Sequence, residues 1–96
     1  MTYRFLSPAL EELTAAVEFY EAQQPGLGAR FLEEIDSAIR RIVAHPEAWA
    51  RLSQNTRRCR THRFPFGIVY HVVDAEIVIV SIMHMRRHPD SWMRNL

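Results

Sequence analysis

The sequence contains one cysteine, no lysine and three glycines in 96 residues. Because Cys59 is alone, no disulfide can form within the chain and no metal site built only of cysteines is possible. The three glycines, at positions 26, 28 and 67, lack the spacing of a phosphate-binding loop. The sequence shows no secretory signal and no apolar run long enough to cross a bilayer, so we expect a cytoplasmic protein.

Length and composition predict one small globular domain over residues 1–96. Hydrophobic residues make up 48% of the chain and charged residues 24%, which is typical of a folded protein and argues against disorder. A chain of this length has room for one compact core and not for two domains.

The absence of lysine makes all twelve basic residues arginine, and they are unevenly distributed. Residues 1–50 carry four arginines and eight acids, a formal charge of −4, whereas residues 51–96 carry eight arginines and three acids, a charge of +5. A bias toward GC-rich codons would explain the missing lysine but not this segregation. Since the arginine fork suits phosphate and carboxylate groups, the second half is predicted to meet an anionic partner.

Hydrophobic spacing predicts a strand and two helices in the first half. The strand covers residues 2–7, and the first helix begins with Ser7 as its cap and Pro8 at its first position. The second helix ends near Ala44, and the turn at 23–28 makes the two helices an antiparallel hairpin. The inward residues of the first helix are Leu10, Leu13, Ala16, Val17 and Tyr20, and its glutamates at 11, 12, 18 and 21 are expected to face water. The inward residues of the second are Phe31, Ile35, Ala38, Ile39 and Ile42, with Leu32 and Val43 widening the stripe.

Three strands are predicted in the second half, at residues 57–64, 66–73 and 76–83. Only two residues, Asp74 and Ala75, separate the last two strands, so these form an antiparallel hairpin. The third strand is apolar on both faces, which indicates a central strand covered by the helices. The order β-α-α-β-β-β, with the helix hairpin packed on a mainly antiparallel sheet, defines an α+β fold.

Metal binding and nucleophilic catalysis are both poorly supported. His84 and His88 are four residues apart, but Pro89 disfavours a helix there and no nearby Cys, Asp or Glu completes a ligand set. We expect neither a metal nor a cofactor. The arginines beside Cys59 would lower the pKa of its thiol and make it reactive, although a packing role is the more common one for a single cysteine in a strand.

The arginines are the most informative feature. In an extended strand at 57–64, Arg58, Arg60 and His62 project from one face. The opposite face would carry Arg57, Cys59, Thr61 and Arg63, and the Arg86–Arg87 segment would close one end of the basic row. An edge strand protected by its charge is the alternative. The predicted target-binding surface consists of Arg58, Arg60, His62, Arg63, His84, Arg86 and Arg87.

Within the segment that follows the last strand, the residues have different expected roles. Arg87 is the weaker member of the surface, because it should point away from Arg86. Pro89 and Trp92 are expected to be structural, the proline stopping the strand and the tryptophan folding the tail back on the domain.

Two stretches carry a family resemblance. "RFPFGIVYHVV" followed by "EIVIVSIMHMRRHPDSW" resembles the C-terminal half of the RelE/ParE superfamily of type II toxin–antitoxin toxins, and "YEAQQPGLGARFLEEIDSAIRRIVAHP" resembles the helix hairpin of the same superfamily. The resemblance covers residues 3 to 92. It implies the same β-α-α-β-β-β fold that the hydrophobic periodicity predicts.

The resemblance implies one of two activities, because RelE-like members cut messenger RNA on the ribosome and ParE-like members inhibit DNA gyrase. Gly67 stands where the nuclease pattern has an arginine, and Trp92 stands where it has a tyrosine. An indole cannot transfer a proton as a phenol can. His84 could replace it as a general base, so whether the chain is an enzyme stays open; if it is a nuclease, the catalytic residues are Arg58, Arg60, His84 and Arg86. Of the two activities, the ParE-like inhibition of DNA gyrase is favoured.

The resemblance also implies the partners. We expect a cognate antitoxin in a plasmid-stabilisation module, with DNA gyrase as the target, or the ribosome and messenger RNA in the alternative, and neither a membrane nor a small-molecule substrate. The antitoxin is expected to lay a flexible segment along the helix hairpin and a sheet edge. A third possibility is a degenerate binding module that is no longer toxic.

Overall fold

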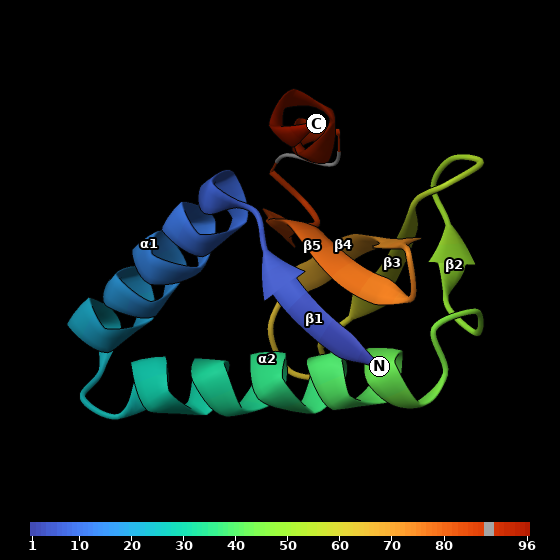
Figure 1. The fold of residues 1–96 in the computed structure, drawn as a ribbon. Helices are drawn as coiled ribbons and strands as arrows, with labels where there is room; N and C mark the ends of the chain where they lie inside the picture. Colours follow the sequence, from blue (N-terminus) through green and yellow to red (C-terminus); the bar gives the residue numbers. More distant parts are fainter. Residues whose placement is uncertain (88–89) are drawn as a thin grey trace.

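Two helices cover one face of a five-stranded mixed sheet in the computed structural model, which describes residues 1–87 and 90–96 (Figure 1). The strand order is β1-β5-β4-β3-β2, with β1 parallel to β5 and the other pairs antiparallel. The predicted α+β fold with a helix hairpin on the sheet is confirmed. The elements are β1 Thr2–Phe5, α1 Ser7–Gln23, α2 Leu27–Ala44, β2 Ala50–Arg51, β3 Arg57–Arg60, β4 Phe66–Val73, β5 Glu76–His84 and the 3-10 helix η1 Ser91–Asn95.

Strand β5 lies in the sheet interior between β1 and β4 and is buried on both faces, as its apolar sequence predicted. Every side chain from Ile77 to Met83 is at most 2% exposed. On one face, Ile77, Ile79 and Ile82 join the core formed with the helices. On the other face, Val80 and Met83 pack with residues of β4 and of the C-terminal segment. Two different parts of the chain therefore cover the two faces of β5: the helices on one face, and the C-terminal segment on the other.

The C-terminal segment is the second cover. The indole of Trp92 is buried against Val69, Val80 and Met83. The C-terminal segment that carries it lies on the side of the sheet opposite α2 (Figure 1). This confirms that Trp92 folds the tail back on the sheet. Pro89 and His88, for which the sequence predicted a strand stop and weighed a metal ligand, lie outside the described residues.

Each helix matches its predicted core stripe except at one residue. In α2 all five predicted inward residues are buried and Val43 packs against the core, but Leu32, expected to widen the stripe, is 44% exposed. In α1, Ala16 is buried as predicted, but Leu10 is 52% exposed and Ala9 is fully buried instead. Two small alanines let the helix approach β5 closely. The partly buried members of this stripe are Leu13, Val17 and Tyr20.

The start of α1 also differs from the prediction. The cap residue is Leu6 in an extended conformation, no side chain bonds the free N–H groups there, and Ser7 lies inside the helix with Pro8 in its first turn. The leucine carbonyl accepts from the Leu10 N–H at 3.1 Å, and the leucine N–H donates to Ile79 of β5 at 2.9 Å. Leu6 thus joins the end of β1 directly to the helix, and no residue is left between them for a serine cap.

Strand β3 is shorter than predicted, and β2 was not predicted. The strand ends at Arg60, and a turn over 61–65 replaces the expected continuation to residue 64. The Thr61 hydroxyl donates to the Phe64 carbonyl at 2.7 Å, and Pro65 has no N–H to offer a ladder. Strand β2 has only two residues, too few for a periodic signal.

Neither described helix is long and apolar enough to cross a membrane.

The β4–β5 hairpin turns through Asp74 and Ala75, both in the left-handed region with φ of 51° and 62°. Two left-handed central residues are the signature of a type I′ turn, in which Asn-Gly is preferred. Aspartate tolerates this conformation, but alanine has a Cβ that disfavours it. Position 75 therefore carries strain that the chain accepts in return for a tight hairpin.

Replacing Ala75 with glycine should raise the free energy of unfolding by about 0.5–1 kcal/mol, because glycine adopts this φ without a Cβ clash. Thermal or urea unfolding measures the change. The matched control is Ala15→Gly in the middle of α1, which should instead lower stability by about 1 kcal/mol. Destabilisation by both substitutions would contradict the strain at position 75.

Candidate target-binding surface

Arg58 and Arg60 project from the sheet face that the helices leave open. The side chain between them, Cys59, points the other way and lies 4.0 Å from the Ala38 carbonyl of α2. The register pairs Arg58 with Val69 and Arg60 with Gly67. The alternation predicted for this strand is confirmed over residues 57–60, the part that is extended.

Gly67 provides the space in which the Arg58 side chain lies. A Cβ at position 67 would be 3.0 Å from Cγ and Cδ of Arg58 and 2.8 Å from the sulfur of Met85. The glycine that stands where a nuclease would have an arginine therefore makes room for the stem of another arginine. Any larger residue would have to displace it.

The Arg58 guanidinium is poorly satisfied within the chain. Its Nε is buried and has no hydrogen-bond partner. Burial, and then the neighbouring charge of Arg60, lower the pKa of Arg58, yet an arginine remains protonated at neutral pH. A buried donor without an acceptor costs free energy, which an anionic group from a partner would recover.

The turn after β5 brings Arg86 close to Arg60 and His62, and these three residues are called the arginine rim. Arg60, His62 and Arg86 line a hollow of about 260 Å³ with Pro65 and Met85. Met85 fixes this arrangement, because its N–H donates to the Pro65 carbonyl at 2.8 Å. Three of the predicted surface residues are thus adjacent.

His84 holds the turn that carries the two arginines. Its Nδ1 accepts the backbone N–H of Arg86 at 3.2 Å and that of Arg87 at 3.1 Å, and its ring packs against Phe66 with the centroids 5.2 Å apart. When Nδ1 accepts, the neutral imidazole carries its proton on Nε2. A ring in that tautomer donates at Nε2 and has no lone pair left for a general base.

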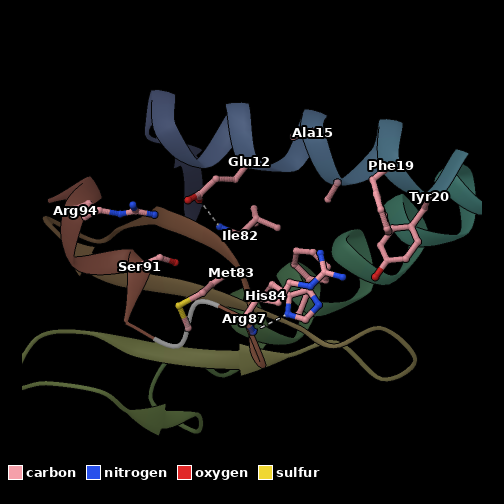
Figure 2. A pocket seen from close by; sticks show the side chains of 12 residues that line it. Glu12, Ala15, Phe19, Tyr20, Ile82, Met83, His84, Arg87, Ser91 and Arg94 are labelled. Carbon is pink, nitrogen blue, oxygen red and sulfur yellow. Dashed lines mark hydrogen bonds between the residues drawn. The ribbon is translucent and has the colours of Figure 1, made fainter. Parts of the chain in front are cut away.

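Arg87 points away from Arg86, as predicted. Its guanidinium carbon lies 6.0 Å from the centroid of the Phe19 ring on α1. Arg87 and Phe19 line an apolar groove of about 430 Å³ between α1 and the end of β5, and His84 also lines it (Figure 2). The predicted surface is therefore divided between two faces, with Arg87 on the helix side.

Arg63 lies apart from the other predicted residues. Glu34 of α2 accepts the backbone N–H of His62 at 2.8 Å and that of Arg63 at 3.0 Å through the same carboxylate oxygen. Arg63 consequently lies beside Arg30 and Glu34 in a different hollow. The expectation that Arg58, Arg60 and His62 form one strand face is wrong for His62, which reaches the rim from the turn.

Glu12 is an interacting residue that the sequence reasoning missed. One oxygen of its carboxylate accepts from the Ser81 hydroxyl at 2.8 Å. The same oxygen accepts from the Ile82 N–H at 3.0 Å (Figure 2). The Asn95 amide donates to the same oxygen at 3.2 Å and to the Val80 carbonyl at 2.9 Å. The prediction that Glu12 faces water is wrong. Its spacing of four from Ala16, which is on the predicted stripe, and of three from Ala9, which is not, would indicate an inner position.

Cys59 is packed in the core. Burial raises the pKa of its thiol, while a hydrogen bond and the charge from Arg41 lower it by less. The expectation that the flanking arginines lower this pKa is wrong, because Arg58 and Arg60 project from the opposite face. Within residues 1–87 and 90–96, no three His, Cys, Asp or Glu side chains are grouped so that they could hold a metal ion.

The helix hairpin packed on the mixed sheet is the fold that the resemblance to the RelE/ParE superfamily implies. A sequence model described as "ParE toxin of type II toxin-antitoxin system, parDE" matches residues 3–89, and the chain belongs to this family. Such a system has two components, which implies an antitoxin as partner. A solved structure titled "Chromosomal ParDE TA system from P. aeruginosa" is similar with a TM-score of 0.76 and 22% identity, over 88% of this chain and 95% of that chain. At this identity the likeness shows the fold. No curated protein sequence matches significantly.

The Glu34 contact predicts a pH-dependent contribution to stability. Desolvation by itself would raise the pKa of Glu34, but the N–H donors of Arg63 and His62 and their nearby charges lower it below its usual value of 4.5. A lowered folded-state pKa gives stabilisation that is complete above the unfolded-state pKa and is lost as the pH falls through the folded-state pKa.

Glu34→Gln should therefore lower the free energy of unfolding by about 1 kcal/mol at pH 7, since a neutral acceptor replaces a charged one. At pH 3 the difference from the parent protein should be much smaller. Urea unfolding at the two pH values measures it, with Glu33→Gln as the control on the adjacent exposed position. An equal loss at both pH values would contradict the assignment.

Proposed function

We propose that this chain is a growth-inhibiting toxin that binds DNA gyrase through Arg58, Arg60 and Arg86, and that a cognate antitoxin neutralises it within a plasmid-stabilisation module. The observation that carries the choice of target is the state of His84. Its Nδ1 is engaged by two backbone donors, so it does not offer the base that a nuclease requires.

Trp92, at the second position where a nuclease would transfer a proton, also favours a binding function over nuclease activity. Trp92, which stands where a nuclease has a tyrosine, is buried in the cluster with Val80 and Met83. Its indole would be a donor only, even if it were exposed. Among the described residues, the rim thus has cations to meet negative charge but no assembled acid and base, which suits a surface that binds a protein target.

The arginines suit an acidic partner surface. Arg58 has an unsatisfied buried Nε, and Arg60 and Arg86 share a hollow at the rim. In the part of the chain that the structure describes, none of the three forms an ion pair with a carboxylate. Charges left unpaired in this way speed association with an oppositely charged surface and select against other partners.

The antitoxin is the second proposed partner. The helix hairpin exposes large apolar side chains, among them Leu10, Phe19 and Leu32. Strand β1 is at the end of the sheet order, so its outer edge pairs with no described strand. Apolar helix surface beside an open strand edge suits a flexible segment that folds as it binds.

The first test measures inhibition of gyrase supercoiling by the purified protein. The double variant Arg58→Ala/Arg60→Ala should need about tenfold more protein or more for the same inhibition, because lost charge pairs in an interface typically cost several kcal/mol. Arg30→Ala, an exposed arginine on α2, is the matched control and should leave inhibition unchanged. No inhibition by the parent protein at large excess would reject the gyrase target.

Primer extension on translated messages from cells that express the protein distinguishes gyrase inhibition from the alternative, a ribosome-dependent nuclease. Cuts in phase with codons that disappear in Arg86→Ala would establish the ribosome-dependent nuclease instead. Normal growth on induction without antitoxin would favour the non-toxic binding module.

A second variant tests the position of Arg58 without removing any charge. Gly67→Ala places a methyl group against Arg58 and Met85, whose flexible side chains can shift without loss of the fold. We expect weaker gyrase inhibition with a thermal midpoint close to that of the parent protein. Unchanged inhibition would show that the position of Arg58 over residue 67 has no part in target binding.

A further inference from the structure

Two arginines face each other directly on the short β2–β3 hairpin. Residues Arg51 and Arg57 are partners in the antiparallel register, and Arg57 is in turn the partner of Tyr70 on β4. Directly opposite residues project from the same face with Cβ atoms about 5 Å apart, and like charges in this position are destabilising. The hairpin thus brings together two charges that repel each other, and the repulsion is part of the folded state.

Main-chain carbonyls, not acids, hold these two guanidinium groups. Arg57 donates through Nη1 to the Trp49 carbonyl at 2.9 Å, and Arg51 donates through Nη1 to the Gln54 carbonyl at 3.1 Å. Among the described residues, neither forms an ion pair with a carboxylate. Each guanidinium has five N–H donors, so most of the donors are left for another acceptor.

The pair borders a polar hollow of about 390 Å³. Gln54 and Asn55 also line it, and so does His71. Arginines and side-chain amides are among the groups that contact phosphate oxygens in protein–DNA complexes. One acid, Glu47, also lines the hollow, so the lining has two arginines against one carboxylate.

The hollow is separate from the proposed gyrase surface. Strand β4 runs from Phe66, which lies beside the Arg60–Arg86 rim, to Val73, which lines this hollow. Arg57 is on the opposite face of β3 from Arg58, because the two are neighbours in an extended strand. No residue of the proposed gyrase surface lines the hollow.

We propose that Arg51 and Arg57 form a binding site for a phosphate group, supplied either by a nucleic acid strand or by a free nucleotide. A phosphate has several oxygens arranged around one centre, so it can bind two guanidinium forks at once, whereas one carboxylate fills one fork. Binding of an anion removes the repulsion between the two arginines, and this adds to the free energy of binding. Among the described residues, no carboxylate supplies the same compensation. This site does not rest on the choice of gyrase as target.

Calorimetric titration of the intact protein tests the site with pyrophosphate, ATP and a single-stranded eight-residue oligothymidylate, and citrate serves as a carboxylate probe. Saturable binding of pyrophosphate is expected, weakened about tenfold or more by Arg51→Ala and by Arg57→Ala, since each removes charged hydrogen bonds. Arg57→Lys keeps the charge and should also weaken binding, because lysine lacks the fork. Arg30→Ala should bind as the parent protein does.

The pattern of ligands identifies the source of the phosphate. Binding of the oligonucleotide at lower concentration than ATP, with the same dependence on Arg51 and Arg57, supports a nucleic acid strand. Tighter binding of ATP supports a free nucleotide. Absence of pyrophosphate binding, binding that survives both alanine variants, or equal binding of citrate would each overturn the proposal. Thermal unfolding of each variant is the accompanying check, and Arg51→Ala, on an exposed two-residue strand, decides the matter if Arg57→Ala is unstable.

Discussion

The structure depends on the complete burial of β5. Seven consecutive side chains of this strand are removed from water, so both of its faces need an apolar cover and both of its edges need hydrogen-bond partners. Strand β4 pairs with one edge from Glu76 to His84, with a register shift between Val69 and Tyr70 that leaves Val80 without a partner on β4. The other edge is paired with β1 only as far as Ile79, because β1 ends at Phe5.

Side chains take over where β1 ends. The Leu6 N–H makes the last main-chain bond to β5, at the Ile79 carbonyl. Beyond it, the Glu12 carboxylate accepts the Ile82 N–H and the Asn95 amide donates to the Val80 carbonyl, so one acceptor and one donor replace the missing strand. Because Glu12 is on α1 and Asn95 follows Trp92, the contact that completes the edge also fixes the helix and the C-terminal cover. The arginine rim lies beyond the end of this strand, where the Met85 N–H donates to the Pro65 carbonyl.

The sequence predicts those parts of the fold that a single periodic pattern determines. Helix α2 and strand β5 have long, regular apolar patterns, so their positions and nearly all of their buried residues are predicted correctly, Leu32 being the exception, and the two-residue turn between β4 and β5 allows only a hairpin. The stripe of α1 was placed on Leu10 because hydrophobicity ranks leucine above alanine, whereas close packing on β5 favours Ala9. The end of β3 depends on Thr61, Pro65 and a carboxylate from residue 34, a distant contact that no local pattern contains. For the candidate site, the alternation of Arg58 and Arg60 was readable from the strand, but the placement of His62 and Arg63 by Glu34 was not.

Acids of the first half and several arginines contact different main-chain groups in the structure. Several acids of the first half accept main-chain N–H groups: Glu12 from β5, Glu21 from Gly26 and Gly28 at the turn between the helices, and Glu34 from the turn after β3. The arginines complement them by donating to main-chain carbonyls, as Arg41 does to Arg60, Arg51 to Gln54 and Arg57 to Trp49. Acids and arginines therefore seldom neutralise each other, and the described ion pairs are limited to Arg4 with Glu76 and Arg40 with Asp36. A carboxylate has few acceptor positions and uses them on the backbone, whereas an arginine with one donor engaged still has four others. Glu12, Glu21 and Glu34 thus help to hold the fold, whereas Arg41, Arg51 and Arg57 are fixed by carbonyls and keep most of their donors for an anionic partner.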